Sequence, residues 1–228
     1  MTLLSQERKA YIAPFIVFML LLGLVGFLKG LPFGGSLFFI GSPQYWIFPL
    51  QTVVCGGLMI RYWRHYQFRR PTNLVFTLFI AVLVLVLWIS PQLFFHQPSR
   101  RDGFDPTVFQ DNPLLYYATV ALRFLRMAVV VPFLEEIFWR GFLLRDLIHE
   151  DFKKVPFGAF SWMSFAVVTF LFGLEHYPAD FWPGIVTGAL YNLIIYRTRS
   201  LASCVLAHAV TNLGLGIYIM QTKQWGFW

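Results

Sequence analysis

Long apolar runs, separated by short polar or basic loops, make up most of the chain. Two of them, "YIAPFIVFMLLLGLVGFL" from Tyr11 and "NLVFTLFIAVLVLVLWIS" from Asn73, approach the ~20 residues that a helix needs to cross ~30 Å of hydrocarbon. Neither shows the apolar and polar alternation that is typical of membrane barrel strands. The pattern therefore predicts helical spans, near residues 11–29, 45–62, 73–90, 114–134, 157–175, 181–196 and 201–220.

The predicted fold is all-α, a polytopic transmembrane helical bundle of about seven to eight spans in a single integral membrane domain over residues 1–228. The count is open because residues 135–148 either continue the fourth span or form a separate short helix. Pro132 predicts a kink there, since proline removes a backbone donor and clashes with the preceding turn. Gly184 and Gly188 form a GxxxG pattern, which indicates close contact between helices.

Composition supports an integral membrane protein, because 57% of the residues are hydrophobic and only 13% are charged. The formal charge of +7 does not indicate nucleic-acid binding, since the basic residues gather at the ends of spans, as in "RYWRHYQFRR". We therefore expect the lipid bilayer, and no nucleic acid, as a partner. The positive-inside rule predicts a multi-pass protein of the cell membrane with a cytoplasmic amino terminus.

Charged and hydrogen-bonding side chains at membrane depth cost a few kcal/mol or more unless they have partners, so each is a functional candidate. Three clusters stand out, Glu135 with Glu136 and Arg140, Phe172 with His176, and His208 with Asn212.

In the first cluster, neighbouring helical residues diverge by about 100°, so the two glutamates cannot face the same point. Glu136 and Arg140 are four residues apart, with the acid first, which is the favoured order for an intrahelical ion pair. We therefore assign them a supporting role and Glu135 a catalytic one. The structural alternative is that both acids pair with basic groups on other helices, such as Arg123 or Arg126.

His208 and Asn212 share one helical face, where an imidazole and a carboxamide can donate hydrogen bonds to a developing oxyanion. They could instead be hydrogen-bonding contacts between helices. His176 could likewise be an interfacial histidine at the end of a span. Glu175 directly precedes it, where an acid either raises the proton affinity of the histidine or faces water.

One carboxylate, two histidines and an amide suffice to hydrolyse an acyl bond with activated water. No serine or cysteine is placed convincingly as a nucleophile, and Cys55 and Cys204 lie in apolar runs without CxxC spacing. We expect no cofactor. A zinc site formed by Glu135, His176 and His208 is an alternative, which the absence of HExxH weakens.

The three clusters, read as "EEIFWRG", "FGLEH" and "HAVTN", resemble the EExxxR, FxxxH and HxxxN motifs of the CPBP family. This family of CAAX prenyl endopeptidases and bacteriocin-processing enzymes comprises intramembrane proteases. The resemblance covers roughly the carboxy-terminal half, and the motif-bearing core spans about residues 114–220. It implies that Glu135 and His176 activate water, that His208 and Asn212 form the oxyanion hole, and that Glu136 and Arg140 support them.

The hypothesis is an endopeptidase that acts on a membrane-associated or CAAX-like protein or peptide. The first alternative is a non-catalytic membrane scaffold or immunity protein that keeps the motifs for structure, and this predicts that Glu135→Gln leaves function intact. The second is a small-solute transporter, since buried acids and histidines also form proton relays. Transporters often have repeated halves, which this chain lacks.

Overall fold

The computed structural model of the protein describes residues 5–31, 38–176 and 178–228, and this part of the chain contains helices and no strand. The longer helices are α1 (Gln6–Lys29), α3 (Gln44–Arg61), α4 (Leu74–Phe94), α5 (Pro113–Leu125), α8 (Trp162–Leu174), α9 (Phe181–Thr198) and α10 (Leu201–Thr222). The shorter α-helices are α2 (Phe38–Gly41), α6 (Val131–Glu136) and α7 (Leu144–Asp146). These helices confirm the predicted all-α bundle.

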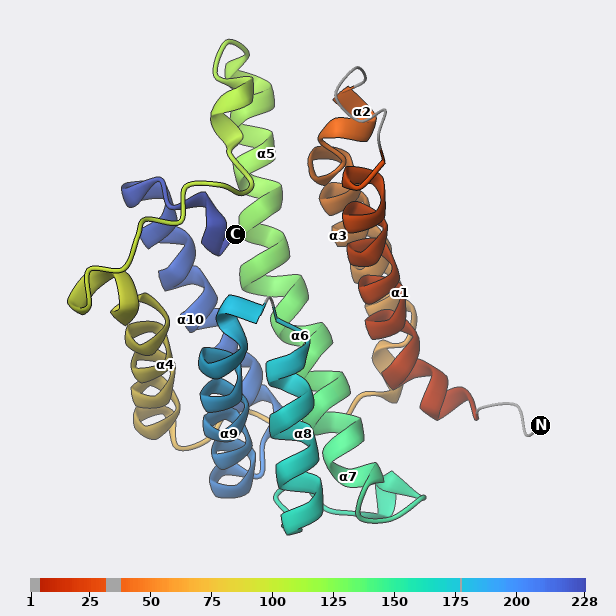
Figure 1. The fold of residues 1–228 in the computed structure, drawn as a ribbon. Coiled ribbons are helices and arrows are strands. Elements are labelled where there is room, and N and C mark those ends of the chain that lie inside the picture. Colours follow the sequence, from red (N-terminus) through yellow and green to blue (C-terminus); the bar gives the residue numbers. More distant parts are fainter. Residues whose placement is uncertain (1–4, 32–37, 177) are drawn as a thin grey trace.

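One helix continues without a break through α5, α6 and α7, from Pro113 to Asp146, and runs through the middle of the bundle (Figure 1). Two stretches of π-helix, η3 (Arg126–Val130) and η4 (Ile137–Leu143), join its α-helical parts. Residues 135–148 therefore continue the fourth span almost to their end. Pro132 does not end the helix, because the wider turns of η3 precede it.

Four helices among the described residues are long and apolar enough to cross a membrane, namely 6–29, 74–94, 113–146 and 201–222. The other three predicted spans correspond to α3, α8 and α9, of which α8 is the shortest. Many large apolar side chains point outward, such as Val75 at 87% and Leu114 at 82% exposure. Such a surface suits lipid rather than water.

Glycines bring α8 and α9 together, as the GxxxG pattern predicts. A Cβ atom added to Gly184 would lie 3.0 Å from the Cα of Gly173, and one added to Gly188 would lie 3.2 Å from the Cβ of Phe172. Phe172 belongs to the second motif, so this close contact determines where that motif lies.

The basic loops meet at one end of the bundle. Arg8 near the start of α1 binds Asp146 at 2.6 Å and also the carbonyl of Glu150, and Lys153 pairs with Glu7. Ser200, between α9 and α10, contacts the carbonyl of Arg70 at 3.1 Å. Positive charge on this shared end agrees with the positive-inside pattern.

Candidate active site

The first motif lies on the central helix, where Glu136 and Arg140 are both 0% exposed. Arg140 Nη1 lies 3.1 Å from Glu136 Oε1, which confirms the predicted ion pair. Its other nitrogens reach α9, with Nε donating to Asn192 Oδ1 and Nη2 to the Gly188 carbonyl, both at 3.0 Å. Arg140 therefore joins the first-motif helix to α9.

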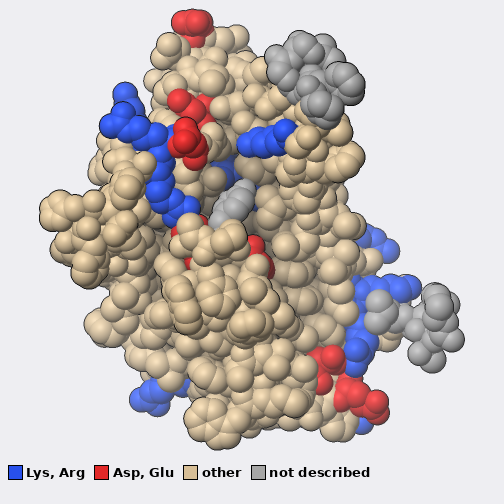
Figure 2. Space-filling view, viewed as in Figure 1, with Lys and Arg blue, Asp and Glu red and all other residues tan. Residues whose placement is uncertain are grey.

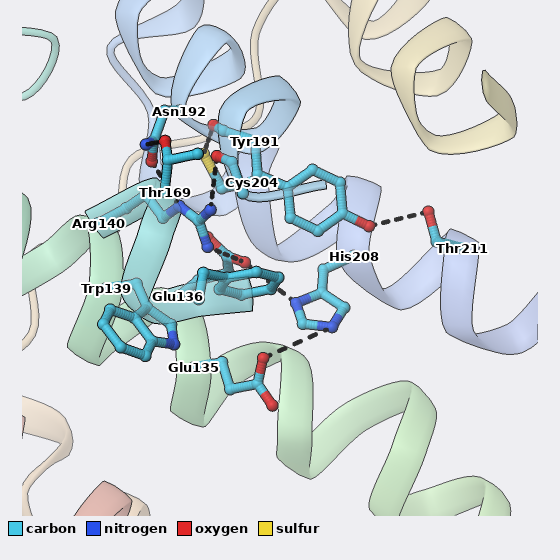
Figure 3. Close-up of polar contacts among 12 residues, drawn as sticks. Glu135, Glu136, Trp139, Arg140, Thr169, Tyr191, Asn192, Cys204, His208 and Thr211 are labelled. Atoms are coloured by element: carbon cyan, nitrogen blue, oxygen red, sulfur yellow. Dashed lines mark hydrogen bonds and ion pairs between the residues drawn. The ribbon is translucent and has the colours of Figure 1, made fainter. Parts of the chain in front are cut away.

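His208 of the third motif lies between the two glutamates (Figure 3). Its Nδ1 is 3.0 Å from Glu136 Oε1, and its Nε2 is 4.0 Å from Glu135 Oε2. The first distance is a hydrogen bond and the second is only an electrostatic contact. If Glu136 is ionised, Nδ1 carries the hydrogen, and Nε2 remains directed toward Glu135.

His176 of the second motif lies just after α8, with its Nδ1 2.7 Å from the carbonyl oxygen of Phe172. Only a protonated Nδ1 can bond to a carbonyl, so the neutral ring leaves Nε2 as an acceptor. The ring also lies near Trp88, with 5.4 Å between the ring centroids. Nε2 of His176 is therefore able to accept a hydrogen bond from a water molecule.

Asn212 lies one turn after His208, and its Nδ2 donates to the carbonyl of Met127 at 2.8 Å. In η3 the Val131 N–H bonds to the Arg126 carbonyl, five residues back, so the corresponding donor to Met127 would be Pro132. Proline has no N–H, and Asn212 supplies the missing donor. One hydrogen of the Asn212 amide therefore has a structural role, and the second is available for other contacts.

A cavity of about 550 Å³ brings together all four residues that the sequence predicts to be catalytic, Glu135, His176, His208 and Asn212. The supporting residues, Glu136 and Arg140, do not line it and lie behind its wall. Figure 2 shows acidic atoms inside a hollow on this face of the molecule, with basic side chains nearby. The separation of the two glutamates follows from the helical geometry of the first motif.

Sequence reasoning missed the α9 residues that hold Arg140. Asn192 is fully buried and donates in turn to Thr169 Oγ1 at 3.1 Å. Tyr191, which also lines the cavity, donates to Thr211 Oγ1 at 2.9 Å. The buried asparagine in an apolar helix was the available signal, because such groups require partners.

Within the described ranges, no group of three or more His, Cys, Asp or Glu side chains is arranged to hold a metal ion. The alternative ligand set of Glu135, His176 and His208 lines the cavity without forming such a group. The residues as arranged therefore do not fit a zinc site. Cys55 and Cys204 are both buried and unpaired by disulfides.

Fold and site together define a polytopic helical membrane protein with a buried acid–base cluster that opens onto a cavity. Residues 117–214 match the model of the family described as type II CAAX prenyl endopeptidase Rce1-like. This match confirms the resemblance over a region that contains all three motifs, and the protein is a membrane peptidase. No curated protein and no solved structure matches the chain.

Proposed function

We propose that the protein is an intramembrane endopeptidase that cleaves a membrane-associated or CAAX-like protein or peptide with water activated by Glu135 and His176. One observation carries the proposal: the four candidate catalytic side chains line a single cavity, while the Glu136–Arg140 pair lies behind them. This arrangement supplies an acid–base group, a water-orienting group and two oxyanion donors at one place.

In the proposed reaction, water donates one hydrogen bond to His176 Nε2 and loses its other proton to Glu135. Its oxygen bonds to the scissile carbonyl carbon, and the carbonyl electron pair moves to the oxygen. His208 and Asn212 donate hydrogen bonds to this oxyanion. When the oxyanion collapses, the C–N bond breaks, and Glu135 returns its proton to the amine nitrogen. The products are a carboxylic acid and a free amine, and Glu135 is again a carboxylate.

This role requires His208 to donate through Nε2 while Nδ1 donates to Glu136, so the imidazole carries both protons throughout the cycle and neither gains nor loses one. The buried Glu136 carboxylate, 3.0 Å from Nδ1, compensates the positive charge. Arg140 binds the same oxygen of Glu136 at 3.1 Å and holds it in place. The supporting pair therefore acts on the oxyanion hole through His208.

We further propose that the reaction needs no metal and that the amino terminus faces the cytoplasm. The four side chains that line the cavity supply the acid–base group and the oxyanion donors that hydrolysis needs, which supports the first point. The shared end of the basic loops, with Arg8, Arg70 and Lys153, supports the second. Cysteine labelling at either end of the bundle in intact cells tests the orientation.

Terminal-peptide mass spectrometry tests the function on membranes from cells that express the wild type, Glu135→Gln or Glu150→Gln at matched levels. Glu150 is exposed and outside the cavity, so Glu150→Gln controls for the loss of one carboxylate. We expect new protein ends with the wild type and Glu150→Gln, and none with Glu135→Gln. If Glu135→Gln yields the same ends as the wild type, Glu135 is not the base. If no protein ends differ between the two, and Glu135→Gln still produces whatever cellular effect the wild type has, the protein acts as a scaffold and not as a peptidase.

A further inference from the structure

Glu175 is an additional acid at the cavity, next to His176 in the second motif. Trp139 lies on the first-motif helix, and its indole Nε1 is 3.2 and 3.3 Å from the two carboxylate oxygens of Glu175. Trp139 is only 4% exposed, and its ring packs against Phe15 and Phe138. A rigid, buried donor therefore holds the Glu175 carboxyl group against the cavity wall.

Trp139 lies about one helical turn after Glu135, so its hydrogen bonds to Glu175 place the Glu175 carboxyl group beside that of Glu135 on the cavity wall. Two adjacent carboxylates repel each other in a poorly hydrated site, whereas one shared proton converts the repulsion into a hydrogen bond. The indole cannot supply this proton, because its single hydrogen already points to Glu175. One of the two carboxyl groups must therefore carry it.

Other charges also act on this pair. Arg140 attracts Glu175 electrostatically from η4. Further titratable or charged groups lie on the cavity walls, namely Lys29, Arg123, Arg126, His176, Asp180 and His208. Glu135 differs from all of these groups because its carboxyl group lies about one helical turn before Trp139, the residue that binds Glu175, and is also the candidate base.

We propose that Glu175 is a positioning residue for peptide hydrolysis: its protonated carboxyl group, held by Trp139, donates a hydrogen bond to Glu135 and orients it toward the attacking water. The inference rests on the proposed function, because it takes Glu135 as the base. The proton from water binds the second oxygen of Glu135 and passes to the leaving amine. Glu175 keeps its own proton throughout, so the cycle ends in its initial protonation state.

Two substitutions separate this role from simple packing. Glu175→Gln keeps an N–H donor toward Glu135 and a carbonyl acceptor for Trp139, but it cannot ionise. Glu175→Ala removes the donor, the acceptor and the ionisable group. We expect Glu175→Gln to retain near-wild-type kcat and to stay active at higher pH, where ionisation of Glu175 inactivates the wild type. Glu175→Ala should lower kcat by about tenfold or more with little change in KM.

The assay uses purified protein in detergent and a quenched peptide that spans the cleavage site mapped by the mass spectrometry above. Glu150→Gln is the matched control and should leave both kcat and the pH profile unchanged. Trp139→Phe keeps an aromatic ring and loses the N–H that binds Glu175. It should therefore shift the pH profile, and this test remains if Glu175→Ala fails to fold. Infrared spectroscopy needs no substrate, and a protonated carboxyl band should disappear in Glu175→Gln.

A wild-type pH profile in Glu175→Gln together with an unchanged infrared band would overturn the inference. So would a loss of kcat in Glu175→Gln as large as in Glu175→Ala, since an ionised Glu175 would then be required. Failure of the proposed function gives a different pattern, in which Glu135→Gln itself cleaves the peptide as fast as the wild type.

Discussion

Replacing Arg140 by methionine tests whether the buried ion pair organises the site. The substitution keeps an unbranched apolar side chain and removes a guanidinium that is 0% exposed. Three acceptors each lose one donor, namely Glu136 Oε1 at 3.1 Å and Asn192 Oδ1 and the Gly188 carbonyl, both at 3.0 Å. Glu136 keeps only His208 as a charged partner.

Removing one partner of a buried pair costs about 3–5 kcal/mol, because the remaining charge is left uncompensated. Each neutral acceptor left without a donor adds about 1–3 kcal/mol when it cannot reach water, although these costs do not sum fully. Since His208 still binds Glu136, we expect Arg140→Met to lose about 3–5 kcal/mol in total. Arg140→Lys should lose less, because lysine keeps the charge but not the forked geometry.

The assay is equilibrium unfolding in mixed micelles, with Arg101→Met as the control at an exposed site, which should change stability by no more than about 0.5 kcal/mol. The double variant Arg140→Met/Glu136→Gln removes the uncompensated charge and should be more stable than Arg140→Met alone. A loss below about 1 kcal/mol in Arg140→Met, or a double variant that is less stable than the single one, would refute the electrostatic reasoning.

Three further predictions concern the same region. Gly184→Ala should cost about 1–3 kcal/mol and lower kcat, because its Cβ would lie 3.0 Å from Gly173 Cα and 3.2 Å from His176 Nδ1, whereas Gly57→Ala meets nothing within 4 Å and should be tolerated. Asn212→Ala should lower kcat and should also lower the free energy of unfolding by about 1–2 kcal/mol. Pro132→Ala restores a backbone N–H, so the double variant Asn212→Ala/Pro132→Ala should lose less stability than Asn212→Ala alone. Dialysis against a chelator should leave peptidase activity within about twofold, and stoichiometric zinc lost together with activity and restored on readdition would contradict the metal-free mechanism.

The length of the apolar runs predicted the long helices of the described chain to within several residues, except the end of the central helix at Asp146, because a bilayer demands helices of this kind. The motif spacing also predicted the Glu136–Arg140 pair and the shared face of His208 and Asn212. These relations depend on residues within one helix, where geometry is nearly fixed. Contacts between helices, such as Arg140 with Asn192, depend on packing that a single sequence does not reveal.

The depth of the site residues in the membrane was likewise not predictable from the sequence. The helix from Pro113 to Asp146 has 34 residues and is therefore about 51 Å long, well beyond ~30 Å of hydrocarbon. Its upper end rises above α10 in Figure 1. Counting residues from the start of this helix thus does not locate Glu135 relative to His176, and the structure is needed to show that both line one cavity.

The two adjacent glutamates obtain different surroundings because each shares a helical face with the residue four positions later. Glu136 and Arg140 point to the bundle interior, where the arginine neutralises the carboxylate. Trp139 binds Glu175, and Glu135 lines the same cavity as Glu175. A rotation of about 100° per residue therefore separates a structural pair from a chemical pair within six residues. The tryptophan in "EEIFWRG" was a visible signal for the second pair, since a buried indole N–H needs an acceptor, and Glu175 in "FGLEH" supplies it.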